Sequence, residues 1–322
     1  MKDIIIMGTG KAALLHYNSY KKNKVEGEIF FVDIKNEGKK IHIKNIYTSI
    51  KECITLNNLK SNNLIIDICT PKSEFFKILD ICKQLGIVDV LVEKPFVIDE
   101  QIINKYENLN IVMVENYLYS KISIFMKKYI NDNKKEIDLI YTNFSKNRVM
   151  DSFNGRGCVK EVPLNFEIEM PHQVYLAQYF LDNPREVINN ISCSRDMIFD
   201  NKILKNHGFG LIISKYKDIS IIHESDLTSN ITQKKIIICT KDNFVIEGNY
   251  AIYSNDLRIL KPANVKIYNK GKLIYSEIMV KDDNFTYFIK EVYSFFNGKS
   301  NNPNIVDIKT FSKLMKIYYE NL

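Results

Sequence analysis

The first third of the chain alternates short, continuously apolar runs with segments whose apolar residues recur at helical spacing. A run that is apolar at successive positions is typical of a strand in a parallel sheet, which helices cover on both faces. The alternation therefore predicts an α/β domain with a doubly wound sheet. We expect strands at residues 3–7, 29–33, 64–69, 88–92 and 111–114, a weak strand or loop at 41–46, and helices from about Lys11, at 71–86 and at 99–108.

The pattern changes after about Tyr119. Strand-like runs now follow one another, and their connections are too short for helical crossovers, so the sheet should be large and mainly antiparallel. We expect strands at 137–144, 210–214, 219–223, 235–240, 244–248 and 265–274, helices at 121–131, 171–181, 284–297 and 305–322, and an irregular segment at 146–160. The chain is thus predicted to form an α/β domain, 1–118, and an α+β domain, 119–322, with the C-terminal helix packing back on the first.

A glycine-bearing turn follows the first predicted strand. Residues 8–13 are Gly-Thr-Gly-Lys-Ala-Ala, which matches the G-x-G-x-x-A pattern of a dinucleotide-binding turn. Gly8 permits the tight turn, Gly10 lets the backbone approach a pyrophosphate, and Ala13 lets the next helix pack closely on the strand. The start of that helix favours the anion. The pattern alone also occurs in ordinary turns between a strand and a helix, so its neighbours decide its meaning.

An acidic residue stands at the end of the second predicted strand. Asp33 follows the turn by about 20 residues, where a carboxylate accepts hydrogen bonds from a ribose 2′-hydroxyl and repels a 2′-phosphate. Strand, turn, helix, strand and acid thus arrive in the order of a Rossmann domain that binds NAD. NADP is the alternative, because Lys35 lies close enough in sequence to meet a 2′-phosphate.

Glu93, Lys94 and Pro95 follow the strand predicted at 88–92. Pro95 restricts Lys94 to an extended backbone, so the ammonium group points out of the carboxyl edge of the sheet, where ligands of open α/β folds bind. A cation there can polarise a substrate hydroxyl as a hydride leaves. The alternative is an ordinary charged strand end with a proline stop.

His172 begins a predicted helix and follows two carboxylates, Glu167 and Glu169. A histidine beside a carboxylate is a natural general acid and base near neutral pH. The alternative is a structural role, in which the same carboxylates cap the N-terminus of the helix and offset its dipole. The remaining histidines are expected to be structural, with His207 as a loop residue within reach of a substrate; they are His16, His42, His207 and His223.

Composition narrows the class of protein. The 322 residues are 45% hydrophobic, enough for a substantial core, and the net charge of +7 comes from lysines scattered along the chain. No basic stripe with interleaved aromatics is present, which argues against a nucleic-acid site. The six cysteines have no metal-ligand spacing, no apolar run has the length of a membrane helix, and the N-terminus lacks a signal peptide, so we expect a cytoplasmic protein with mostly buried thiols, no metal and no membrane partner.

Together these features resemble the glucose-fructose oxidoreductase, inositol dehydrogenase and rhizopine-catabolism family (Gfo/Idh/MocA). The resemblance rests on the Gly8 to Ala13 turn, Asp33, Thr70-Pro71, Glu93-Lys94-Pro95 and a later histidine helix followed by an antiparallel sheet. It implies NAD(P)-dependent oxidation or reduction at a carbon of a sugar, cyclitol or sugar derivative. It also implies that Lys94 and His172 are the catalytic lysine and histidine.

One position departs from the family pattern. The family often has an aspartate four residues before the histidine, where this chain has Ile168, so Glu169 or Glu167 is expected to replace that acid. This departure bears on the identity of the substrate more than on the presence of a cofactor. It also keeps open two other activities, reduction of a carbon–nitrogen double bond and redox-neutral, NAD-dependent glycoside hydrolysis. A nucleotide-sensing protein without turnover is the non-enzymatic alternative.

The sequence therefore predicts an oxidoreductase in which Lys94, His172 and Glu169 assist proton transfer. A homodimer or homotetramer through the C-terminal sheet is expected, because the run at 236–239 is apolar at every position. The residues expected to hold the cofactor are Gly8, Thr9, Gly10, Lys11, Ala12, Asp33, Thr70, Pro71, Glu93 and Lys94, and those expected to contact the substrate are Asn116, Tyr117, Arg156 and Glu167.

Overall fold

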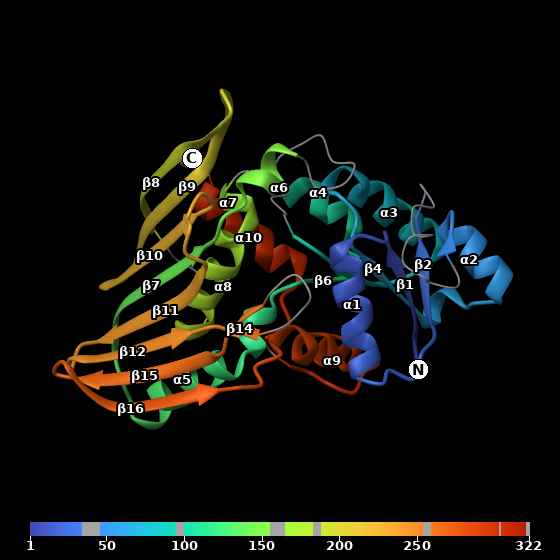
Figure 1. The fold of residues 1–322 in the computed structure, drawn as a ribbon. Coiled ribbons are helices and arrows are strands. Elements are labelled where there is room, and N and C mark those ends of the chain that lie inside the picture. Colours follow the sequence, from blue (N-terminus) through green and yellow to red (C-terminus); the bar gives the residue numbers. More distant parts are fainter. Residues whose placement is uncertain are drawn as a thin grey trace. The chain divides into compact units, whose positions relative to one another are not determined.

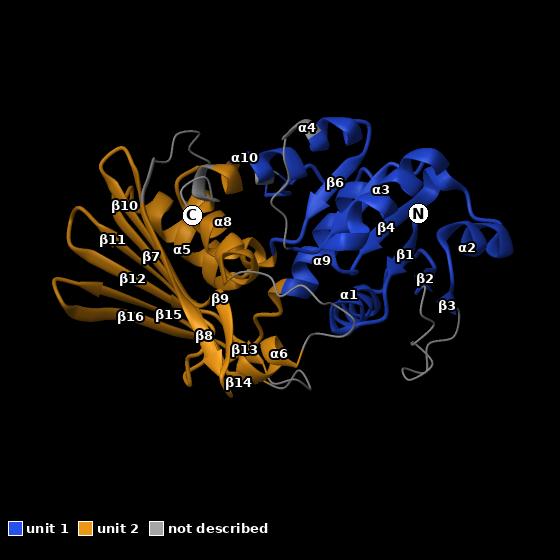
Figure 2. Ribbon diagram, turned by 90° about the horizontal axis from the view of Figure 1, so that it is seen from above, with its two compact units in different colours: residues 1–115, 285–313 blue, residues 116–284, 314–322 orange. Residues whose placement is uncertain are grey.

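Two compact units make up the chain (Figure 2): unit 1 is residues 1–115 and 285–313, and unit 2 is residues 116–284 and 314–322. The first is α/β and the second α+β, as the sequence predicts. The boundaries predicted for the domains stay a prediction. No helix among the described residues has the length and apolarity needed to cross a membrane. The computed structural model describes residues 1–33, 46–94, 100–154, 165–182, 188–253, 259–302 and 304–319.

Unit 1 contains a six-stranded sheet in the order β3-β2-β1-β4-β5-β6 (Figure 1). Every pair in it is parallel. The order reverses between β1 and β4, and ligands of open α/β sheets bind beside the carboxyl ends of the strands at such a reversal. The strands are β1 (Asp3–Met7), β2 (Ile29–Val32), β3 (Ile46–Tyr47), β4 (Leu64–Ile68), β5 (Asp89–Val92) and β6 (Asn110–Met113).

A helix at Ile50–Asn57 was not predicted, and the other helices of unit 1 follow the predicted periodicity with one exception. In α3 the buried residues Phe75, Leu79 and Cys82 lie on one face, and Gly86 ends the helix at a φ of +70°. The helix expected at 99–108 is instead a short α4 followed by a 3₁₀ turn at Asn104–Tyr106. The helices are α1 (Lys11–Lys22), α2 (Ile50–Asn57), α3 (Lys72–Leu85), α4 (Glu100–Ile103) and α9 (Asn284–Phe296), with α10 (Ile308–Tyr319) shared between the units.

Unit 2 is built on an eight-stranded sheet in the order β16-β15-β12-β11-β7-β10-β9-β8. Its pairs are antiparallel except for β7 with β10, which are parallel. The sequence missed β8, because its polar residues hide the alternation expected of a half-buried strand. The strands are β7 (Ile137–Ser145), β8 (Ile188–Phe199), β9 (Lys202–Tyr216), β10 (Ile219–Asp226), β11 (Gln233–Thr240), β12 (Phe244–Asn249), β15 (Ala263–Asn269) and β16 (Lys272–Met279), beside a small ladder of β13 (Ile252–Tyr253) and β14 (Ile259–Lys261).

The helices of unit 2 lie on one face of this sheet (Figure 1). α5 (Lys121–Asp132) packs so closely that a Cβ on Gly248 would come within 2.5 Å of Met126 Sδ and 2.6 Å of Ile122 Cγ2. α8 (Met170–Phe180) is buried along nearly its whole length. The segment expected to be irregular contains α6 (Val149–Phe153), and α7 (Asn165–Ile168) was not predicted.

Candidate functional site

The glycine turn joins β1 to α1 in the conformation that the sequence requires. Gly8 has a φ of +93°, which favours glycine, and its N–H donates to the Val32 carbonyl at 2.7 Å. A Cβ on Gly10 would meet nothing within 4 Å, so the backbone there is open to a ligand. Gly10 caps α1 without a side-chain hydrogen bond, and the first helical turn contains no acid. The helix N-terminus is therefore available to an anion.

Asp33 lies beside the turn. Its backbone N–H donates to the Tyr47 carbonyl at 2.9 Å, and Thr9 Oγ1 donates to its Oδ2 at 2.5 Å. Thr70 lies on the other side, with Cγ2 at 3.4 Å from the position of a Gly8 Cβ. Lys35 lies outside the described residues. The ends of β1, β2 and β4 thus gather the predicted cofactor residues, with Lys11 exposed, Ala12 half-buried and Pro71 capping α3.

Glu93 and Lys94, both half-buried, follow β5 at the same edge, and His16 holds Glu93 in place. His16 Nε2 lies 2.9 Å from Glu93 Oε1, and its Nδ1 lies 2.8 Å from Asp67 Oδ2. Because both partners are carboxylates, both ring nitrogens donate and the ring carries a positive charge. Burial, the largest single influence, would lower the pKa of His16, but the charges of Asp67 and Cys69 and the hydrogen bonds to them together raise it well above its ordinary value.

The same hydrogen bond acts on Glu93. Burial, the largest single influence, would raise the pKa of this carboxyl, but the hydrogen bond from His16 and the charges of His16 and Lys94 together lower it. Glu93 is therefore an anion beside Lys94. The sequence argument set His16 aside as structural, although its spacing from Ala13 and Tyr20 on the buried face of α1 was a signal. A histidine on a buried face needs buried polar partners.

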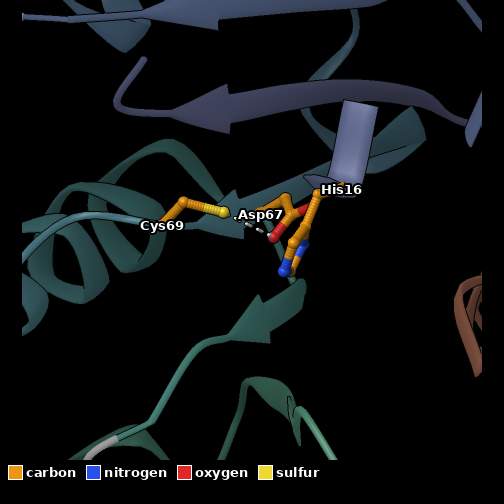
Figure 3. A group of neighbouring side chains, drawn as sticks. All are labelled: His16, Asp67 and Cys69. Atoms are coloured by element: carbon orange, nitrogen blue, oxygen red, sulfur yellow. Dashed lines mark hydrogen bonds and ion pairs between the residues drawn. The ribbon is translucent and has the colours of Figure 1, made fainter. Parts of the chain in front are cut away.

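His16, Asp67 and Cys69 form a compact group (Figure 3) in which the possible ligand atoms all lie within 4.8 Å of one another. Metal ligands must be deprotonated. Here His16 is protonated, Asp67 is already bonded to it, and burial raises the pKa of the Cys69 thiol. The chemistry of the three side chains fits a hydrogen-bonded cluster better than a metal site.

Glu115, two residues after β6, is a residue that the sequence argument missed. Burial, together with the like charge of Glu93 and against the attraction of Lys94, raises its pKa to about 8. Two carboxyl groups of different proton affinity therefore lie at the strand ends that present Lys94. A glutamate directly after an apolar strand was the available signal.

In unit 2, the carboxylate of Glu169 lies among cations at the start of α8. Its Oε1 is 2.7 Å from both Lys146 Nζ and Arg148 Nη2, and its Oε2 is 4.0 Å from Lys234 Nζ. Glu169 is only 2% exposed. Burial lowers the pKa of Lys146 to about 7, even though Glu169 opposes that shift.

His172 lies one turn into α8 and is buried. Its ring packs edge-on against the ring of Tyr117, with 4.9 Å between the centroids. Tyr117 also accepts a hydrogen bond from Lys234, and burial raises the pKa of its hydroxyl, which keeps it neutral. Unit 2 thus brings together Tyr117, Glu169 and His172.

The remaining predicted substrate residues are more scattered. Asn116 is buried directly before Tyr117 in a 3₁₀ turn, Asn116–Tyr119, and Glu167 is half-buried in α7. Arg156 and Pro95 lie outside the described residues. Lys94 belongs to unit 1, and His172 and Glu169 belong to unit 2.

No protein-family model matches the sequence, and a search of curated proteins finds no relative. Solved structures match it over almost its whole length. The chain has the fold of known oxidoreductases. An oxidoreductase from Agrobacterium radiobacter in complex with NAD⁺, L-tartaric acid and magnesium superposes with a TM-score of 0.70 at 13% identity, covering 99% of this chain and 96% of that one.

Two dehydrogenases share the fold. UDP-N-acetylglucosamine 3-dehydrogenase from Acidithiobacillus ferrooxidans gives a TM-score of 0.69 at 11% identity, over 98% of this chain and 95% of that one. A dehydrogenase from Clostridium difficile gives 0.66 at 17% identity, over 98% and 96%. At identities this low, the structural matches show the fold of this chain alone. The roles of its residues must be argued from its own geometry.

Proposed function

We propose that the protein is an NAD(P)-dependent oxidoreductase of the Gfo/Idh/MocA type, which transfers a hydride to or from a carbon of a sugar, cyclitol or sugar-derived molecule. The observation that carries the proposal is the edge of unit 1, where the open turn at Gly10, the carboxylate of Asp33 and Lys94 lie at the ends of parallel strands. Similar folds that bind NAD⁺ or oxidise a sugar nucleotide support it.

The bound nicotinamide would supply the hydride acceptor or donor. Gly10 and the start of α1 would hold the pyrophosphate, and Asp33 with Thr9 the ribose. Lys94 would donate a hydrogen bond to the reacting oxygen of the substrate, which stabilises negative charge there as the hydride leaves. His16 keeps Glu93 ionised, so a carboxylate lies next to Lys94 in the chain.

In unit 2, His172 would take the proton from the substrate or return it. Its ring is fixed by the Tyr117 ring, which limits its orientation. Glu169 forms ion pairs with Lys146 and Arg148. Its assistance to His172 stays a prediction.

Lys94→Ala tests the assignment. We expect the variant to retain NADH binding, measured by calorimetry, and to lose turnover by about 10²-fold or more, as expected when electrostatic stabilisation of the transition state is removed. Turnover is followed as NADH formation over a panel of sugars, cyclitols and sugar acids. Lys77→Ala, which removes an exposed lysine of α3, is the control and should retain full activity. Equal turnover in the two variants would reject Lys94 as the catalytic lysine.

We also propose that the sheet face of unit 2 opposite the helices mediates self-association. Half-buried apolar side chains form a row on this face across neighbouring strands, from Ile237 through Tyr141 and Ile222 to Ile213. A face of this kind needs a cover, and a second copy of the sheet supplies one. Light scattering should show a dimer or tetramer, and Ile222→Glu should shift it towards the monomer.

A further inference from the structure

The cluster around Glu169 contains more positive than negative charge. Lys146, Arg148 and Lys234 surround one buried carboxylate. Among the described residues, the only other ion-pair partner of these basic groups is Asp151, half-exposed and 3.9 Å from Arg148 Nη1. In this part of the chain, three basic side chains thus face two carboxylates.

Several hydrogen-bond donors of the cluster are not used by the described residues. Arg148 Nε is buried and has no hydrogen-bond partner among the described residues, although a guanidinium can donate five hydrogen bonds. Lys146 Nζ, with three donors, bonds Glu169 alone among the described residues. Buried donors in native proteins are nearly always satisfied, so these donors point to a ligand that the chain does not itself provide.

The cluster is closed on one side and open on the other. Glu169 and Arg148 are 2% and 10% exposed, whereas the side chains of Lys146 and Lys234 are 25% and 20% exposed. The side chains of Lys146 and Lys234 are therefore the part of the cluster that a group from solvent can approach. Burial is the main cause of the lowered pKa of Lys146, and the charges of Lys234 and Arg148 add to it, so an anion bound here would favour the charged form of this lysine.

Buried aromatic rings connect the cluster to the proposed proton-transfer residue. Lys234 Nζ lies 5.0 Å from the centroid of the Tyr117 ring and 5.7 Å from that of Phe144. The Tyr117 ring also packs edge-on against the ring of His172. A small molecule held at its acidic end by the ammonium groups would thus have its neutral part beside Tyr117, the neighbour of His172.

We propose that Lys146, Arg148 and Lys234 bind an anionic group of the substrate, a carboxylate or a phosphate. The substrate class is thereby narrowed to sugar acids and sugar phosphates. This inference rests on the proposed function for its reaction but concerns a separate binding step. Glu169 then neutralises part of the cluster while the site is free and orients Arg148 and Lys146 for the ligand.

Binding of D-glucuronate, D-glucose 6-phosphate and D-glucose, measured by calorimetry, tests the site. We expect at least one acidic probe to bind about tenfold more tightly than D-glucose, the factor expected of one charge-assisted hydrogen bond. Comparison of the two acids separates a carboxylate site from a phosphate site. If neither acid binds more tightly than D-glucose, the anion site is wrong.

Variants assign the effect to the cluster. Lys234→Gln and Lys146→Gln should each abolish the preference for the acidic probe. Lys235→Gln removes the same charge from the next residue of β11, which lies over the Tyr141 ring on the other face of the sheet, and should retain the preference. An equal loss in Lys234→Gln and Lys235→Gln would assign the preference to general surface charge and overturn the proposal. Circular dichroism checks that each variant folds.

NADH binding, measured on the same samples, separates this inference from the proposed function. Loss of the acid preference in the Lys234→Gln variant with unchanged NADH affinity supports the anion site. Wild-type protein that binds an acid but no NADH would overturn the proposed function and leave the anion site standing. Intact NADH binding without any acid preference would overturn the anion site alone.

Discussion

The two units contain buried charge clusters of opposite composition. In unit 1 one cation, His16, lies between two carboxylates, and in unit 2 one carboxylate, Glu169, lies among three cations. The first cluster uses every donor of its central ring, so it is closed and can only position what it touches. The second leaves donors unused and partly exposed, so it can accept a ligand. Whether a buried charge cluster can bind a ligand therefore depends more on its unused hydrogen-bond donors than on the sign of its charge.

Removing the central residue of the closed cluster should have the largest effect. His16→Ala leaves Asp67 and Glu93 as buried carboxylates without their shared cation, and loss of one partner of a buried ion pair costs about 3–5 kcal/mol. Urea unfolding measures the change. The control is His207→Ala, which removes a buried histidine bonded to Ser152 outside either cluster. A smaller loss in His16→Ala than in the control would contradict the charged state assigned to His16.

The units should respond to pH in opposite directions. The stability that His16 contributes is fully present below its unfolded pKa, near 6.5, and is lost as pH rises through its raised folded pKa. The pKa of Glu115 is raised from 4.5 to about 8, so its contribution to stability is also lost as the pH rises from 4.5 to about 8. Unit 1 should therefore weaken as pH rises.

Unit 2 contains the opposite case in His223. Burial lowers its pKa from 6.5 to about 3, so its contribution is present above 6.5 and is lost as pH falls towards 3. Amide hydrogen exchange, corrected for intrinsic rates, should show unit 1 less protected at about pH 9 and unit 2 less protected at about pH 5, by on the order of 2 kcal/mol each. Parallel changes in both units would contradict this difference.

Removing the central carboxylate of the open cluster should cost less. Glu169→Gln leaves three cations together, but Lys146 and Lys234 reach solvent, so we expect a loss of about 2 kcal/mol, below the range for fully buried pairs. Glu136→Gln, at an exposed ion pair with Lys241, is the matched control and should change stability by less than about 1 kcal/mol. Added phosphate should restore part of the loss in Glu169→Gln only if the cluster binds anions.

Glu115→Gln should have the smallest effect. With a pKa of about 8 the carboxyl group is mostly protonated at neutral pH, so a neutral amide of similar shape should change the free energy of unfolding by less than about 1 kcal/mol. The variant should, however, lose part of the alkaline destabilisation of unit 1. A large loss at neutral pH would show that Glu115 is ionised there.

The sequence predicted best what depends on neighbouring residues. The turn at Gly8, the stop at Gly86 and the strand end at Lys94 follow from local backbone chemistry. The partners of His16 lie 51 and 77 residues away, and those of Lys234 include Tyr117, 117 residues away. Such pairs depend on strand order, which local periodicity does not specify. The sequence therefore predicted the fold class and missed both charge clusters, and the cofactor residues stay a prediction.

The return of residues 285–313 to unit 1 has a consequence for the order in which the chain folds. Phe285 of α9 packs on the ring of His16 at 4.8 Å, and Asp307 pairs with Val112 beside β6. The ribosome makes these segments after residues 116–284 of unit 2, at about 5–20 residues per second. The N-terminal sheet must therefore wait, incompletely covered, until nearly all of unit 2 has been synthesised. A fragment that ends at residue 115 should accordingly aggregate, and adding a peptide of residues 284–313 should rescue it.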